Sequence, residues 1–260
     1  MGVRRVVVVS PHLDDAVFSL GGTIAALADS GTDVAVLTIF AGDPEADGPP
    51  TPWQQRSGFA STAQAVQVLR AEDAAACELL GATPVWLPFA SGAPDERILD
   101  LLRPALDDAE VVVAPGFPCT HGDHVRATQL TAAVVPQPKL GVYVEQPYAT
   151  WRLLGSRVPL RGRLRALAAL AADGRARRLQ APGPPPALPA LDGALGWGVR
   201  AASTENRRRK RRAMRCYESQ WRIFSTLLLP GIALYERRRG GEELAFVGEA
   251  AAWWEAPLQG

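Results

Sequence analysis

The sequence predicts an α/β fold: a doubly wound, mostly parallel sheet with helices on both faces. Two observations carry this prediction. Runs of apolar, mainly β-branched residues at 6–9 and 111–114 are continuous, which is typical of parallel strands buried on both faces. These runs alternate along the chain with longer amphipathic segments, an order that favours right-handed strand–helix–strand crossovers.

The elements are expected in the following order. A helix at about 16–28 follows the first strand, because apolar residues recur there at helical spacing and Gly31 lies just beyond its end. The polar loop at 42–52 leads into a long helix that ends at residue 80. Further strands are expected at 34–40, 84–87, 111–114 and 140–144, with a helix at 96–106.

Residues 1–260 are predicted to form one domain with a variable insertion at about 151–203, which would cover the functional site. An Arg/Ala/Leu-rich stretch at 160–179 in this insertion is interpreted as a helix. The C-terminal part, at about 204–250, is expected to contain a helix at 205–217. It is also expected to contain a hairpin of strands 232–238 and 244–248, joined across Arg239-Gly240-Gly241.

The charge balance argues against a nucleic-acid or membrane-surface partner, because 28 basic and 27 acidic residues give a formal net charge of +1. The basic run at 207–212 is interpreted as a solvated helix face. No segment approaches the roughly 18 apolar residues of a membrane span. Three scattered cysteines form no disulfide framework, which favours a cytoplasmic location.

All three histidines of the chain lie in two short acidic motifs, His12-Leu13-Asp14-Asp15 and His121-Gly122-Asp123-His124. Each motif follows a predicted strand, at the sheet edge where ligands bind in doubly wound folds. Imidazole and carboxylate together suit a borderline ion such as zinc, so the motifs predict a mononuclear metal site. The alternatives are an acidic helix cap in the first motif, and a capped helix or an exposed polar loop in the second.

These motifs resemble those of the PIG-L/LmbE-like family of zinc-dependent N-deacetylases. Residues 70–81 and the stretch from Lys210 to Gln220 carry further similarity. The resemblance implies a Rossmann-like sheet and a zinc ion, with iron(II) as the alternative metal. The ligands that it implies are His12, Asp15 and His124.

The resemblance also implies catalytic roles. Asp14 would be the general base, and His121 would assist at the oxyanion or the leaving group, with Asp123 orienting its imidazole. Arg70 matches an arginine that helps to hold the sugar, and its alternative is an ordinary surface arginine. Cys119 departs from the family at a place where some members have a tyrosine that polarises the substrate carbonyl.

The expected activity is hydrolysis of an N-acetyl or other acyl group on an amino sugar or sugar-containing natural product, which gives acetate and a free amine. In this mechanism Asp14 takes a proton from water that attacks the carbonyl. One alternative is a zinc amidase acting on a larger amide or a thiol conjugate. A second is a non-catalytic module that binds a sugar or nucleotide.

Overall fold

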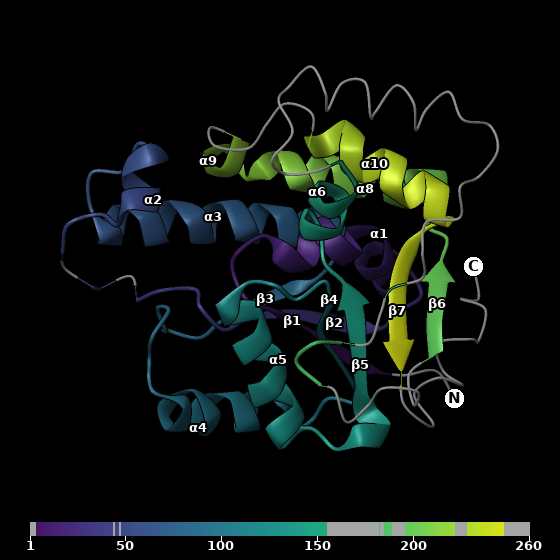
Figure 1. The fold of residues 1–260 in the computed structure, drawn as a ribbon, viewed down its shortest axis with the longest axis horizontal. Coiled ribbons are helices and arrows are strands. Elements are labelled where there is room, and N and C mark those ends of the chain that lie inside the picture. The colour runs from purple at the N-terminus through teal and green to yellow at the C-terminus, as the bar shows by residue number, and fades with distance from the viewer. Residues whose placement is uncertain are drawn as a thin grey trace.

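A seven-stranded sheet runs through the computed structural model, with strand order β3-β2-β1-β4-β5-β7-β6 (Figure 1). The structure describes residues 4–43, 45–46, 48–154, 182, 185–188, 196–221 and 228–246. The strands are β1 (Arg5–Ser10), β2 (Asp33–Thr38), β3 (Thr83–Trp86), β4 (Val111–Phe117), β5 (Leu140–Val144), β6 (Gly196–Arg200) and β7 (Glu242–Phe246). The predicted α/β fold is confirmed.

The order of the strands creates the edge at which the two motifs meet. Strands β3, β2, β1, β4 and β5 are parallel, and β7 is antiparallel to both β5 and β6. The chain builds β2 and β3 on one side of β1 and then returns to place β4 on the other side. This reversal is the topological switch point, and the carboxyl ends of β1 and β4 lie next to each other there.

Helices cover both faces of the sheet (Figure 1). On one side lie α1 (Asp15–Asp29), α3 (Thr62–Leu80) and α8 (Thr204–Cys216), and on the other α4 (Asp95–Leu106) and α5 (Gly122–Val134). The remaining helices are α2 (Pro52–Arg56), a 3-10 turn (Gln137–Lys139), α6 (Tyr148–Leu154), α9 (Glu218–Trp221) and α10 (Leu228–Arg239). None of the helices described is long and apolar enough to cross a membrane.

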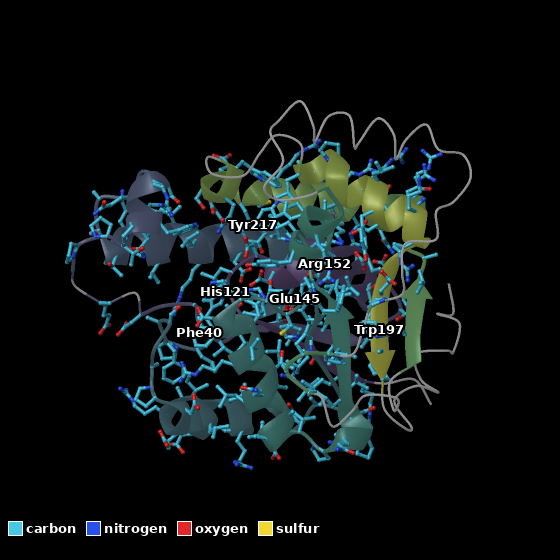
Figure 2. All side chains as sticks on the ribbon, in the orientation of Figure 1. Phe40, His121, Glu145, Arg152, Trp197 and Tyr217 are labelled. Carbon is cyan, nitrogen blue, oxygen red and sulfur yellow. The ribbon has the colours of Figure 1, made fainter. Side chains whose placement is uncertain are left out.

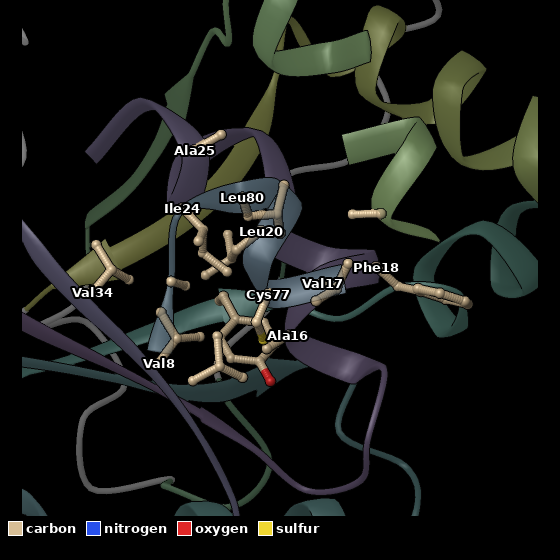
Figure 3. Packing of buried hydrophobic residues seen from close by; sticks show 14 of the residues in the cluster. Val8, Ala16, Val17, Phe18, Leu20, Ile24, Ala25, Val34, Cys77 and Leu80 are labelled. Carbon is tan, nitrogen blue, oxygen red and sulfur yellow. The ribbon is translucent and has the colours of Figure 1, made fainter. Parts of the chain in front are cut away.

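The continuous apolar run of β1 is explained by two separate cores. Val6 and Val8 pack with residues of α1 such as Val17 and Ile24, in the core drawn in Figure 3. Val7 and Val9 point to the opposite face, into the core beneath α4 and α5. Because side chains alternate along a strand, a strand between two helical layers must be apolar at every position.

The predicted C-terminal hairpin is wrong, because its first arm lies in helix α10. Leu228, Ile232 and Tyr235 are the buried side chains that recur here at helical spacing, so this face packs as a helix. The antiparallel partners of β7 are β5 and β6, and β6 lies inside the segment predicted as an insertion. The helix predicted at 160–179 falls outside the described residues.

Helix α8 also differs in one respect from the predicted solvated face, because Lys210 is only 2% exposed. Its Nζ donates to the Ser19 carbonyl and to carboxylates of Glu236 and Glu242, at 3.1, 2.5 and 2.6 Å. Gly21 permits this approach, since a Cβ there would lie 2.8 Å from Cγ of Lys210. The buried lysine therefore ties α8 to α1.

Candidate metal centre

The first motif occupies a tight turn between β1 and α1. Ser10 fixes the turn: its hydroxyl donates to the His12 carbonyl at 2.6 Å and accepts the Ala16 amide at 3.0 Å. The His12 amide donates to Oδ2 of Asp15 at 3.0 Å. These bonds close the turn, so that the His12 imidazole and the Asp15 carboxylate face the same point.

The second motif lies at the N-terminus of α5. His121 is the N-cap residue, and its Nδ1 accepts the Asp123 amide at 3.3 Å. His124 comes one turn later and its side chain is 1% exposed, whereas that of His121 is 49% exposed. The two histidines of this motif therefore differ in environment: one is enclosed beneath the sheet edge and the other lies at the surface.

Three atoms from the two motifs form a small triangle. Nδ1 of His12 lies 3.2 Å from Oδ2 of Asp15 and 3.3 Å from Nε2 of His124, and Nε2 of His124 lies 3.3 Å from the same Asp15 oxygen. Zinc ligands at roughly 2.0–2.2 Å in tetrahedral geometry are separated by about 3.3–3.5 Å. The donor set and its spacing thus fit one zinc-sized ion without rearrangement.

His121 offers a second, wider grouping. Ring nitrogens of His12, His121 and His124 lie within 4.8 Å of one another. The set that includes Asp15 matches the spacing of a tetrahedral ion more closely, since each of its atoms is within 3.3 Å of both others. His121 is therefore better placed beside the ion than on it.

Two further carboxylates lie against the second ring nitrogens of His12 and His124. Oε1 of Glu145, the residue after β5, lies 3.2 Å from Nδ1 of His124. Oδ2 of Asp123 lies 3.1 Å from Nε2 of His12 and accepts a 2.5 Å hydrogen bond from Ser91. Metal-binding histidines typically donate their second N–H to such a carboxylate, which leaves the other nitrogen free for the metal. Figure 2 shows Glu145 near the middle of the sheet edge.

The position of Asp123 corrects its expected partner. The sequence predicts that Asp123 orients His121, but its carboxylate lies 4.0 Å from Nδ1 of His121 and 3.1 Å from His12. The reason is the cap: Nδ1 of His121 already accepts the Asp123 backbone amide, so it presents no N–H to the carboxylate. Asp123 therefore positions the histidine of the other motif.

The centre is electrostatically prepared for positive charge. Burial lowers the pKa of His12, but hydrogen bonds to Asp123 and Asp15 outweigh it and raise that pKa to about 10. The pKa of His124 is also raised despite burial, because Asp15 and Glu145 face it. These carboxylates stabilise positive charge at this point, whether it is carried by protonated imidazoles or by a bound metal ion.

Asp14 is not part of the triangle, but its carboxylate is close enough to interact with the charges of Asp15, His12 and His124. It is the N-cap residue of α1 and 7% exposed, yet its side chain makes no capping hydrogen bond, so the helix-cap alternative for this carboxylate is not supported. Burial and the neighbouring charge of Asp15 raise its pKa well above the usual range. A buried carboxyl group with a raised pKa is a candidate for proton transfer, and its role as the general base stays a prediction.

Arg70, on helix α3, contacts other residues of the protein. Its guanidinium donates to the Gly42 carbonyl and lies 5.3 Å from the centre of the Trp86 ring. The Trp86 indole in turn donates to Asp73, which also accepts from Tyr217. These contacts give Arg70 a structural role in the described residues, and its predicted contact with substrate stays a prediction.

Sequence reasoning missed Glu145 and Tyr148, because neither lies in a histidine motif. The Tyr148 hydroxyl lies 3.4 Å from Nε2 of His124, and the two rings meet edge to face at 4.9 Å. Burial raises the pKa of Tyr148, and the charges of Asp15 and Asp14 raise it further. The signal that could have found both residues is their position directly after β5, which ends beside β4 at the same edge.

Residues 7–135, which contain both histidine motifs, match the family model described as PIG-L: GlcNAc-PI de-N-acetylase. The chain therefore carries a domain of the PIG-L family, as the resemblance of its motifs predicted. A comparison with curated proteins found no match.

Solved structures share the fold over nearly the whole chain. A40926 pseudoaglycone deacetylase Dbv21 is 23% identical and superposes with a TM-score of 0.69, covering 95% of this chain and 97% of its own. The zinc inhibited form of teicoplanin deacetylase Orf2 is 22% identical with a TM-score of 0.69, at 93% and 97% coverage. GalB, a 4-carboxy-2-hydroxymuconate hydratase from Pseudomonas putida KT2440, is 17% identical with a TM-score of 0.55, at 94% and 95% coverage.

Proposed function

We propose that this protein is a metal-dependent hydrolase that removes an N-acetyl group from an amino sugar or a sugar-containing natural product. The observation that carries the proposal is the 3.2–3.3 Å triangle of His12, Asp15 and His124, with the buried Asp14 carboxylate beside it. The fold alone does not decide the reaction, because a hydratase shares it. The site residues and the family domain together favour amide hydrolysis.

Zinc is the proposed ion, held by Nδ1 of His12, Oδ2 of Asp15 and Nε2 of His124, and iron(II) would suit the same donors. When bound, the ion would polarise the acyl carbonyl and make water more acidic. Glu145 and Asp123 would keep the two imidazoles in the orientation that turns a lone pair toward the ion.

The chain's own residues would then move the protons. Asp14 would accept a proton from water as the water oxygen bonds to the acyl carbon. His121 lies at the surface end of the site, with its ring centre 5.2 Å from that of His124. From there the protonated imidazole would give a proton to the amine nitrogen as the carbon–nitrogen bond breaks, which releases acetate and the free amine. The proton that Asp14 took from water would then reprotonate His121, which returns both residues to their starting states.

The substrate class is proposed from the family description and the neighbours. The family model is named for a de-N-acetylase of a GlcNAc lipid, and two neighbours are deacetylases in glycopeptide antibiotic chemistry. We infer an N-acylated amino sugar, free or attached to a larger aglycone. Arg70 is proposed to assist in binding it from beside Trp86.

The test is metal content and acetate release, measured together on matched variants. Wild type is expected to hold about one zinc or iron per chain and to release acetate from N-acetylglucosamine derivatives. His124→Ala is expected to lose the metal. His121→Ala is the matched control in the same motif, and it is expected to keep the metal while turnover falls.

Asp14→Asn separates binding from catalysis. It is expected to retain the metal and to lose about 10²–10⁴-fold in turnover, the range of a general base. Near-wild-type turnover in this variant would overturn the base assignment, and loss of metal in His121→Ala as complete as in His124→Ala would overturn the ligand set. A wild type that neither contains nor takes up metal would refute the hydrolase proposal as a whole.

A further inference from the structure

We propose that Tyr148 is a catalytic residue, whose hydroxyl donates a hydrogen bond to the substrate carbonyl oxygen as that oxygen becomes an oxyanion. The inference rests on the proposed function. It identifies the oxyanion donor from a loop outside both histidine motifs.

The position of the hydroxyl is the first observation. It lies 3.4 Å from Nε2 of His124, the atom that faces the proposed ion. Ligands of one tetrahedral zinc ion are separated by about 3.3–3.5 Å. The hydroxyl therefore lies at the His124 side of the proposed centre, within reach of a carbonyl oxygen that an ion held there would polarise.

The contacts of the hydroxyl favour a donor over a fourth ligand. Each of the three proposed ligand atoms is within 3.3 Å of both others, whereas within the described structure the Tyr148 hydroxyl makes a hydrogen-bond contact with only one of them. A phenol hydroxyl carries an O–H that it can donate. A group that contacts the proposed centre at one atom and offers an O–H has the chemistry that oxyanion stabilisation requires.

The segment around Tyr148, from Glu145 into helix α6, is held by several side-chain contacts. Tyr148 is the first residue of α6, and the ring of Trp151, one helical turn later, packs edge to face against it at 5.5 Å. Just before it, the Gln146 amide donates to the Ser19 hydroxyl at 2.9 Å and Glu145 binds His124. A donor fixed in this way needs no reorganisation when charge develops on the substrate.

Cys119 does not compete for this role. Its sulfur lies 4.0 Å from the Thr128 hydroxyl on α5, its backbone amide donates to Glu145, and its side chain is buried. The thiol therefore packs against α5. Among the described residues, the phenol of Tyr148 is the uncharged hydroxyl donor that contacts His124.

The test compares Tyr148→Phe with Tyr235→Phe. Tyr235 is a matched control, because its hydroxyl donates to Glu243 at 3.0 Å and contacts none of the metal-facing atoms. Three quantities are measured on each zinc-loaded protein: zinc affinity by chelator competition, kcat and KM for acetate release, and the inhibition constant of a methylphosphonamidate analogue of the N-acetyl group. The phosphonyl oxygens of this analogue mimic the tetrahedral intermediate.

Tyr148→Phe is expected to keep its zinc affinity and its KM, to lose about 10²–10³-fold in kcat, and to bind the analogue more weakly by a similar factor. Tyr235→Phe is expected to match wild type in all three. Unchanged kcat in Tyr148→Phe, or loss of zinc together with activity, would overturn the inference while leaving the deacetylase proposal intact. A zinc-loaded wild type that cleaves no acyl amine would overturn both.

Discussion

Replacing Glu236 with glutamine is expected to stabilise the protein at pH 8, whereas the same replacement at Glu242 is expected to destabilise it. Both carboxylates contact Nζ of the buried Lys210, at 2.5 and 2.6 Å. One ammonium group balances one anion, so the two acids cannot both be ionised there without excess negative charge. The structure indicates that Glu236 is the one that takes up a proton.

Glu242 is the carboxylate that also accepts hydrogen bonds from the backbone. It is 4% exposed, and it accepts the amides of Gly22 and Thr23 at 2.9 and 2.7 Å in addition to Lys210. Burial, opposed by Lys210 and reinforced by the charge of Glu242, raises the pKa of Glu236 to about 7. Glu236 is therefore the carboxyl group of this cluster that gains a proton as pH falls through about 7.

The sign of the pH effect follows from this raised pKa. The unfolded chain releases the Glu236 proton near 4.5, and the folded protein keeps it until about 7. The native state thus binds more protons across this window, so the free energy of unfolding falls as pH rises through it. A shift of this size corresponds to at most about 3.4 kcal/mol, and Glu236→Gln, which stays neutral, should recover about 1–3 kcal/mol of it at pH 8.

Glu242→Gln is expected to be destabilising. Both oxygens of Glu242 accept hydrogen bonds, so the amide nitrogen of glutamine would place its N–H groups against a backbone N–H or the ammonium group. Breaking a buried ion pair on one side typically costs about 3–5 kcal/mol. Urea unfolding of both variants and wild type at pH 5 and pH 8 measures the difference, and subtracting wild type at each pH cancels other titrating groups. Equal effects of the two substitutions, or a Glu236→Gln difference that does not grow between pH 5 and pH 8, would refute this assignment of charge.

Three further predictions concern the site and its support. Glu145→Gln should weaken zinc binding about 10–100-fold in chelator competition, with activity recovering at saturating zinc; unchanged affinity would contradict its role in orienting His124. Gly22→Ala places a Cβ 2.9 Å from that of Ala202, so it should lower the free energy of unfolding, measured in urea, by about 1–3 kcal/mol. An unchanged free energy of unfolding would show that α1 and the segment at Ala202 move apart at little cost. Arg70→Lys should raise KM for acetate release at unchanged metal content, whereas altered stability with normal KM would assign Arg70 to the Gly42 and Trp86 contacts alone.

The central strands of the sheet could be predicted because they are apolar at every position. A strand between two helical layers is apolar on both sides, so residues 6–9 and 111–114 stand out without reference to distant parts of the chain. The site was predictable for a related reason. Parallel strands place their carboxyl ends at one edge, which brings together two motifs separated by about a hundred residues of sequence.

The features that were missed depend on partners remote in sequence. The stretch 232–238 has apolar and aromatic residues typical of a strand, and only its packing as α10 shows that the helical period applies. Lys210 is hidden in a run of six basic residues, and its burial is set by Gly21 and two distant glutamates. Glu145 and Tyr148 carry no motif, because their role comes from the placement of β5 beside β4.

Helix α1 connects the metal centre to the buried charge cluster. Its first residue is Asp15, a proposed ligand, and four residues later the Ser19 carbonyl accepts from Lys210 while the Ser19 hydroxyl accepts from Gln146. Gln146 belongs to the loop that orients His124. Helix α1 and the loop after β5 are thus joined through one serine, by hydrogen bonds that require a defined geometry. Apolar packing alone tolerates small shifts between elements, whereas buried polar groups are destabilising unless their partners are in place. The polar contacts around α1 therefore hold the Asp15 and His124 sides of the centre in register.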